Sequence, residues 1–143
     1  MASSNVELVR SIFVAWERGD FGWADWAHPE IEYSMADGPQ PGAWTGLLGM
    51  AEGTRELLSA WEGYRVEALE YRELDDERVL VLLRASGRGR TSGLELAETV
   101  GGSQGANIFH LRSGKVVRLV AYFDSGNALA DLGLAGRATR RDS

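Results

Sequence analysis

The chain of 143 residues contains no cysteine, which excludes disulfide bonds and thiolate metal ligands. Histidine is almost as scarce, because His28 and His110 are the only two and they stand far apart in the sequence. Neither has a nearby ordered set of carboxylates, as a metal centre would need. We therefore predict no metal site and no cofactor.

Long apolar segments are also missing, since no run approaches the roughly 18 residues that cross a bilayer. The N-terminal MASSNVELV lacks the basic stretch and apolar core of a signal peptide. The net charge of −6 is the wrong sign for binding a phosphate backbone. These absences predict a cytoplasmic protein that binds neither membranes nor nucleic acid.

Apolar residues make up 44% of the chain, which is enough to form a packed core. The length is typical of one domain, and no linker or internal repeat interrupts it. We therefore predict a single domain over residues 1–143, with a core at about 5–134. The basic segment 135–143 follows the last apolar residues and is predicted to be a flexible tail.

Helical periodicity is clearest near the N-terminus. Ser4 and Glu7 fit a capping box, apolar residues recur at helical spacing behind them, and Gly19 ends the run. A short second helix is predicted at residues 23–27, before Pro29, and a third at residues 47–61.

Strand-like segments dominate the second half of the chain. The predicted strands are a short one at 31–34, then 64–74, 78–90, one covering 107–111 with an expected start near 94, and 116–124. A closing helix or turn is predicted at 128–134. Helices followed by an antiparallel meander indicate an α+β fold. Six glycines between Gly87 and Gly105 favour bends, so we expect a strongly curved, cone-shaped sheet wrapped by three N-terminal helices around an apolar pocket.

The run Val79–Leu83 is apolar without alternation. Such a run is typical of a strand that is covered on both faces. Helices on one side of the sheet leave the other face uncovered, so we predict a homodimer formed through the outer face of the sheet.

Three segments together resemble a known family. They are ELVRSIFVAWERGD at the N-terminus, GKVVRLVAYFD on the last strand and ALADLGL after it. The chain resembles the SnoaL-like group of the nuclear transport factor 2-like superfamily from about Asn5 to Leu134. That resemblance implies the cone fold, frequent dimerisation, and relatives that include ketosteroid isomerase, limonene epoxide hydrolase, polyketide cyclases and non-catalytic binding modules.

The carboxylates of these relatives are missing at the matching positions. By resemblance to limonene epoxide hydrolase, Tyr33 and Arg84 are retained, but Met35, Ser86 and Ala121 replace the Asn and the two Asp residues. The Asp of the cyclases also maps to Ala121. One carboxylate to activate water and another to protonate an oxygen are therefore absent, and fold alone does not supply a reaction.

Strand alternation predicts part of the pocket wall. Leu119, Ala121 and Phe123 share one face of the last strand, and either core packing or pocket lining accounts for them. Asn107 is a polar residue on the strand face that is predicted to point inward, where its neighbours are apolar. Its amide therefore needs hydrogen bonds from the protein or from a ligand. Trp44 lies in a Pro- and Gly-containing loop and is expected to fold over the pocket mouth.

Three further residues are catalytic candidates. Tyr33 is an expected donor to a ligand oxygen. Asp37, in the loop that follows, is the nearest thing to a free carboxylate, although turn formation is the commoner role of such a residue. For Arg84 and Ser86 two orientations remain open. The alternation of side chains along this strand predicts that both face solvent, whereas the strand register implied by the family resemblance turns both towards the pocket. A buried Arg84 would need a partner, for which Glu98, Asp37 or a ligand carboxylate would serve.

Two functions are therefore predicted as alternatives. The first is binding of a small, mainly apolar or amphipathic molecule in the pocket, and this prediction leaves open whether an isomerase-, cyclase- or hydrolase-like proton transfer accompanies binding. The second is a non-catalytic binding or dimeric assembly module that has lost the family's carboxylates. The predicted ligand-binding residues are Tyr33, Trp44, Arg84, Ser86, Asn107, Leu119, Ala121 and Phe123.

Overall fold

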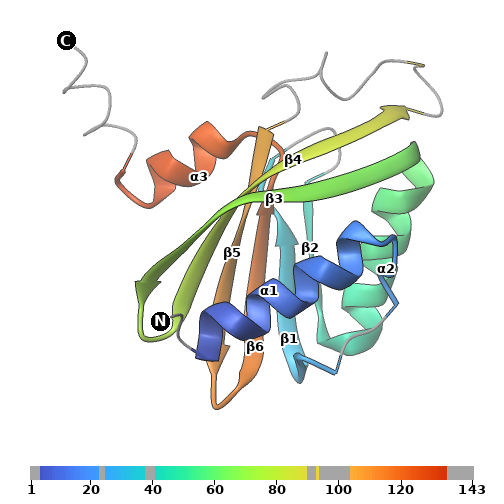
Figure 1. Cartoon of the computed structure of the whole chain (residues 1–143). Coiled ribbons are helices and arrows are strands. Elements are labelled where there is room, and N and C mark those ends of the chain that lie inside the picture. Colours follow the sequence, from blue (N-terminus) through green and yellow to red (C-terminus); the bar gives the residue numbers. More distant parts are fainter. Residues whose placement is uncertain (1–3, 23–24, 38–40, 90–92, 94–103, 135–143) are drawn as a thin grey trace, which may run out of the picture.

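A computed structural model of the chain describes residues 4–22, 25–37, 41–89, 93 and 104–134. Two helices enclose two strands in the N-terminal part of these residues, and four more strands and a third helix follow (Figure 1). In chain order the elements are α1 (Ser4–Glu17), β1 (Ala27–Met35), β2 (Gly42–Thr45), α2 (Gly46–Ala60), β3 (Trp61–Asp75), β4 (Arg78–Gly89), β5 (Gln104–Arg112), β6 (Lys115–Tyr122) and α3 (Ser125–Asp131).

All six strands form one curved sheet in the order β2-β1-β6-β5-β4-β3. Every neighbouring pair is antiparallel except β1 and β6, which run parallel. The β5–β6 hairpin turns through Ser113 and Gly114, with φ angles of 53° and 77°, as its tight two-residue turn requires. The predicted α+β class, the curved sheet and the order of its four long strands are confirmed.

Helix α1 ends where the sequence predicts. Gly19 adopts a φ of 87°, its N–H donates to the Trp16 carbonyl at 2.9 Å, and the Asp20 N–H donates to the Ala15 carbonyl at 2.9 Å. This pair of bonds is a Schellman cap, in which glycine takes the left-handed position at low cost.

The short helix predicted at 23–27 is wrong for residues 25–27, and residues 23–24 lie outside the described part. Asp25 and Trp26 form a turn, and β1 begins at Ala27. Pro29 lies inside this strand, where the β1–β6 register shifts between Ala27 and Glu32. A proline has no N–H for the ladder, so an irregular stretch of strand tolerates it. Within the residues that the structure describes, two helices rather than three therefore precede the long strands.

The helices cover both faces of the sheet. The main core gathers side chains from α1, α2 and the concave inner face, including the fully buried Phe13, Ile31 and Phe109. A second apolar cluster on the outer face includes Leu80 and Ile108 of the sheet, with Leu129 and Leu132 from α3 and its C-terminal end packed against it.

This second cluster bears on the predicted dimer. The segment 79–83 is covered on both faces, but the chain's own C-terminal helix supplies part of the outer cover. The homodimer therefore stays a prediction. The predicted strand start near 94 and the predicted tail at 135–143 lie outside the described residues. No helix within the described part is both long enough and apolar enough to cross a bilayer.

Candidate ligand-binding cavity

A cavity lies between the concave face of the sheet and the two N-terminal helices. The space open to the centre of a water molecule is about 90 Å³, several times the ~10–15 Å³ that one water needs. Its wall is formed by Trp16, Phe21, Trp26, Tyr33, Met35, Met50, Thr54, Leu57, Tyr64, Val66, Leu83, Ala85, Gly105, Asn107, Leu119, Ala121, Tyr122 and Phe123.

The described wall carries no ionisable group of the usual catalytic kinds. None of its residues is Asp, Glu, His, Lys or Arg. Its hydroxyl and amide side chains are Tyr33, Thr54, Tyr64, Asn107 and Tyr122, of which Tyr122 already donates a hydrogen bond to the Asp131 carboxylate. A mainly apolar surface with a few polar groups is typical of small-molecule sites. The sides of the cavity therefore offer hydrogen bonds without charge.

Tyr33 is held in place by close packing on two sides. Its ring stacks on Trp44, with centroids 5.4 Å apart and planes inclined by 28°. On α2, a Cβ built at Gly53 would come within 2.8 Å of both rings. The absence of a side chain at Gly53 therefore lets helix α2 approach the stacked rings closely. This packing leaves Tyr33 only 5% exposed.

Tyr64 reaches the cavity through an irregularity at the start of β3. Pairing with β4 shifts between Glu62 and Arg65, and Gly63 there has a φ of 66°. The extra residue places Trp61, Tyr64 and Val66 on the inner side, although strict alternation from Trp61 would turn Tyr64 outward. Its ring lies beside Phe21, at 6.2 Å between centroids.

Asn107 lies on the floor of the cavity. It is the one buried polar residue among the described part of the chain, at 8% exposure. Its neighbours in register are Val81 on β4 and Ala121 on β6, so it projects beside a small side chain that leaves room above it.

No protein group in the described structure hydrogen-bonds to the side chains of Tyr33, Tyr64 or Asn107. Their polar atoms are nevertheless not sealed in the core, because every fully enclosed side-chain nitrogen or oxygen of the described residues has a partner. Burial raises the pKa of Tyr64 to about 12. Burial, and then the nearby Tyr64, raise the pKa of Tyr33 as well. Both phenols are therefore neutral donors at physiological pH.

The tyrosines make a testable pH prediction. The chain has four, and burial is the largest cause of the raised pKa of each, with values of about 12 for Tyr64 and Tyr122. Unfolded tyrosine titrates near 10, so above that pH the unfolded chain binds fewer protons than the folded one. Stability is therefore complete below pH 10 and should fall as the pH rises from 10 towards 12.

Near-ultraviolet absorbance of tyrosinate would check this prediction by comparing the native protein with the protein in denaturant. The absorbance of tyrosinate should rise at a higher pH in the native protein than in the denatured protein. Tyr64→Phe should remove one of the groups that titrate at high pH. A native curve that coincides with the denatured one would show that the phenols are solvated.

Five of the predicted ligand-binding residues lie in the wall of the cavity. They are Tyr33, Asn107, Leu119, Ala121 and Phe123. Trp44 lies just behind, stacked on Tyr33 and lining a smaller neighbouring hollow together with Phe123 and Trp61. Strand parity predicted the inward orientation of Asn107, Leu119, Ala121 and Phe123, whereas Tyr33 came from the family resemblance. The loop predicted around Trp44 is wrong, because this residue lies in strand β2 and pairs with Tyr33 of β1. The role of all these residues in binding stays a prediction.

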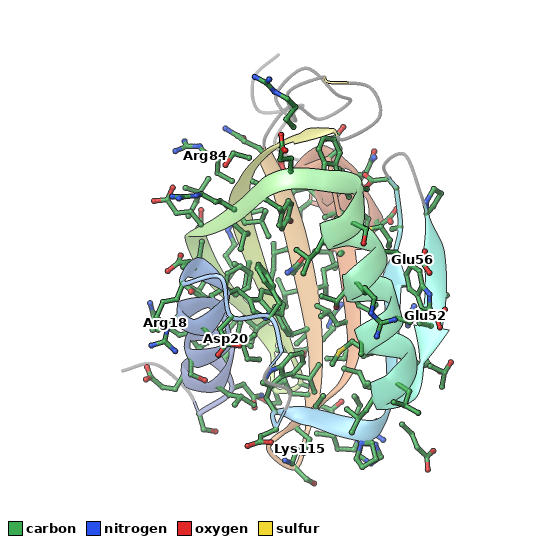
Figure 2. The ribbon with its side chains drawn as sticks, turned by 90° about the vertical axis from the view of Figure 1, so that its right-hand side faces the viewer. Arg18, Asp20, Glu52, Glu56, Arg84 and Lys115 are labelled. Carbon is green, nitrogen blue, oxygen red and sulfur yellow. The ribbon has the colours of Figure 1, made fainter. Side chains whose placement is uncertain are left out.

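The inward orientation considered for Arg84 and Ser86 is wrong. Both are exposed, and the adjacent Leu83 and Ala85 line the cavity instead. The Arg84 guanidinium lies 3.8 Å from the Glu67 carboxylate, its partner in register on β3. Figure 2 shows Arg84 at the outer edge of the molecule. Alternation along β4 is regular here, so the register inferred from the family is displaced by one residue.

Asp37 does not face the cavity as a free carboxylate. Its oxygens accept hydrogen bonds from the backbone N–H of Phe123, from that of Asp124 at 3.2 Å, and from the Asn127 amide at 2.7 Å. The carboxylate therefore ties the end of β1 to the junction of β6 and α3. Glu98, the other proposed partner of Arg84, lies outside the described residues.

His110 lies on the outer face of the sheet, as strand alternation from the inward-facing Asn107 predicts. It is flanked in register by Arg78 and Arg118. Burial, followed by these two cations, lowers its pKa. No three His, Cys, Asp or Glu side chains in the described part gather as metal ligands would.

Sequence reasoning missed Tyr64. This residue shares parity with the apolar Val66, and that signal was available in the sequence. Sequence reasoning also named no helix residue as part of the pocket wall, although Trp16, Met50 and Leu57 line the cavity. Helical periodicity does not distinguish a face that packs in the core from one that lines a pocket.

Comparison with known proteins agrees with the fold. Residues 9–119 match the sequence model of the SnoaL-like domain. No curated protein sequence matches the chain.

Several solved structures share the fold. A nuclear transport factor 2-like protein of unknown function from Burkholderia pseudomallei is 19% identical, with a TM-score of 0.72, over 90% of this chain and 97% of that one. TerC, crystallised with polyporic acid, is 21% identical, with a TM-score of 0.69, over 94% and 99%. A Jannaschia protein assigned as a SnoaL-like polyketide cyclase is 18% identical, with a TM-score of 0.64, over 82% and 83%.

Proposed function

Because this chain belongs to the SnoaL-like domain family, whose model matches most of its length, we propose that the cavity binds a small, mainly apolar molecule. The observation that carries the proposal is a mainly apolar cavity in which three polar side chains, Tyr33, Tyr64 and Asn107, have no protein hydrogen-bond partner in the described structure. A polar group in such a place costs free energy unless water or a ligand satisfies it. The crystallisation of TerC with polyporic acid supports ligand binding by this kind of fold.

Binding without side-chain acid–base catalysis fits the wall best. General acid–base catalysis needs a group whose pKa lies near the working pH, and the described wall offers only phenols with raised pKa values. The positions that the family resemblance assigns to carboxylates hold Ser86, which faces outward, and Ala121, which lines the cavity. We therefore favour the binding module over the enzyme. The cytoplasmic location is kept as a prediction.

A cyclase- or isomerase-like activity is the second candidate, favoured by the two neutral donors. Donors of this kind stabilise charge that develops on a carbonyl oxygen. Acetophenone in heavy water tests it directly, because proton abstraction would exchange its methyl hydrogens for deuterium. Exchange above the rate in buffer, lost in Tyr33→Phe, would establish catalysis; an unchanged rate would leave binding alone.

Filling the cavity tests the binding proposal. Ala121 lies in the wall, so Ala121→Leu adds a branched side chain to the space a ligand would occupy. We expect the affinity for acetophenone to fall by at least tenfold, since a clash of this size costs more than about 1.4 kcal/mol. The NMR signals of the indole N–H groups measure binding, because Trp16 and Trp26 also line the cavity.

Ala51→Leu is the matched control, since it adds the same atoms at an exposed position of α2. It should leave the affinity unchanged. Equal affinities of the wild-type protein and the folded Ala121→Leu variant would show that the cavity is not the binding site.

A further inference from the structure

We propose that the cavity selects a neutral ligand whose carbonyl-type oxygen accepts hydrogen bonds from both Tyr33 and Tyr64. This inference rests on the proposed function and names the chemical class of its ligand. It assigns a specific role to Tyr64, and it separates ligands by charge.

The curvature of the sheet brings the two phenols to one space. Tyr33 belongs to β1 and Tyr64 to β3, and three strands separate β1 from β3 in the sheet. Both side chains nevertheless line the same cavity. After burial, Tyr64 also contributes to the raised pKa of Tyr33. A ligand in this cavity would therefore meet two donors that come from strands on opposite sides of the curved sheet.

The chemistry of the donors specifies an acceptor. Each phenol has one hydroxyl proton, and no protein acceptor takes it among the described residues. A carbonyl oxygen has two lone pairs and accepts from both hydroxyls at once. Asn107 on the floor offers both a donor and an acceptor to a second polar group of the ligand.

The absence of charge in the wall sets the second part of the selectivity. An anion entering the cavity would leave its hydration shell, and the described wall contains no Arg, Lys or His to compensate. Arg84, the nearest candidate from the sequence, is exposed and lies close to Glu67. A carboxylate ligand should therefore bind more weakly than a ketone of the same size.

Three probes of similar size test this selectivity. Acetophenone carries a ketone, benzoate a carboxylate, and ethylbenzene no oxygen. At neutral pH we expect acetophenone to bind roughly tenfold more tightly than either of the others. Tyr33→Phe and Tyr64→Phe should each lower the affinity for acetophenone roughly fivefold and leave that for ethylbenzene unchanged.

The carbonyl stretching frequency of bound acetophenone gives an independent reading. It should be lower in the wild-type protein than in either variant, and closest to the value in an apolar solvent in the double variant. Tyr71→Phe is the matched control, because Tyr71 is on β3 but does not line the cavity. It should change neither affinity nor frequency.

The outcomes separate this inference from the proposed function. Equal binding of acetophenone and ethylbenzene, both blocked by Ala121→Leu, would overturn the inference and leave the cavity as a binding site. Tighter binding of benzoate would also overturn it. Failure of all three probes to bind would overturn the proposed function.

Discussion

Asp37→Ala is expected to lower the free energy of unfolding by about 2–4 kcal/mol, because three hydrogen bonds to one carboxylate are lost together. Two of the donors are backbone N–H groups, of Phe123 and Asp124, that would then lack this acceptor. Bonds to a charged group contribute about 1.5–3 kcal/mol each when buried. The two backbone bonds here are only part-buried and the bond from Asn127 is exposed, so the sum of the three is smaller.

The bonds of Asp37 also connect stability to the cavity. Phe123 lines the cavity wall, and Asp124 caps α3 by accepting from the Gly126 N–H at 2.9 Å. Loss of the Asp37 carboxylate should therefore loosen both the rim of the cavity and the attachment of α3. Weaker acetophenone binding by the folded Asp37→Ala protein is expected alongside the loss of stability.

Urea unfolding measures the effect, and Asp20→Ala is its control. Asp20 makes one local bond at an exposed position, accepting from the Gly22 N–H at 3.2 Å. Its removal should change the free energy of unfolding by no more than about 0.5 kcal/mol. Equal effects of the two substitutions would mean that Asp37 does not join β1 to the β6–α3 junction.

Gly53→Ala is expected to destabilise the protein by about 1–3 kcal/mol, although alanine normally stabilises a helix by about 1 kcal/mol over glycine. The added Cβ would lie 2.8 Å from the Trp44 Cδ2 and the Tyr33 Cε2. Such approaches require both stacked rings to move. Displacement of Tyr33 should also weaken acetophenone binding, since its hydroxyl is aimed by this packing.

Gly49→Ala on the same helix provides the comparison, because its Cβ would come no closer than 3.3 Å to Trp44. Thermal unfolding should give Gly53→Ala the lower midpoint, by several degrees. A higher midpoint for Gly53→Ala than for the wild-type protein would show that α2 does not pack on the Tyr33–Trp44 stack.

Local patterns predicted much of the fold. Helix α1 and its end at Gly19 follow from apolar spacing and a glycine stop, and the inward parity of Leu119, Ala121 and Phe123 follows from strand alternation. The short helix at 23–27 failed, because β1 and its pairing with β6 begin at Ala27. Pairing partners far away in sequence are invisible to a local pattern.

The site was less predictable than the fold, for a related reason. Asp37 acts on residues about 90 positions away, and only the folded chain shows that its oxygens are occupied. The sequence shows that Tyr64 shares parity with Val66, but it does not show the irregularity in β3 that turns both residues inward together with Trp61. Arg84 was misplaced by a register shift of one residue. The family scaffold was therefore identified from short segments, whereas the chemistry of the cavity needed the exact orientation of single side chains.

A crystal structure of the protein grown with acetophenone tests the central claim most directly. The proposal predicts density for the ligand inside the cavity, with its oxygen within hydrogen-bond distance of the Tyr33 and Tyr64 hydroxyls and its ring among the apolar side chains. A cavity filled by the protein's own side chains, or acetophenone bound only on the outer surface, would contradict the claim that this fold encloses a ligand site.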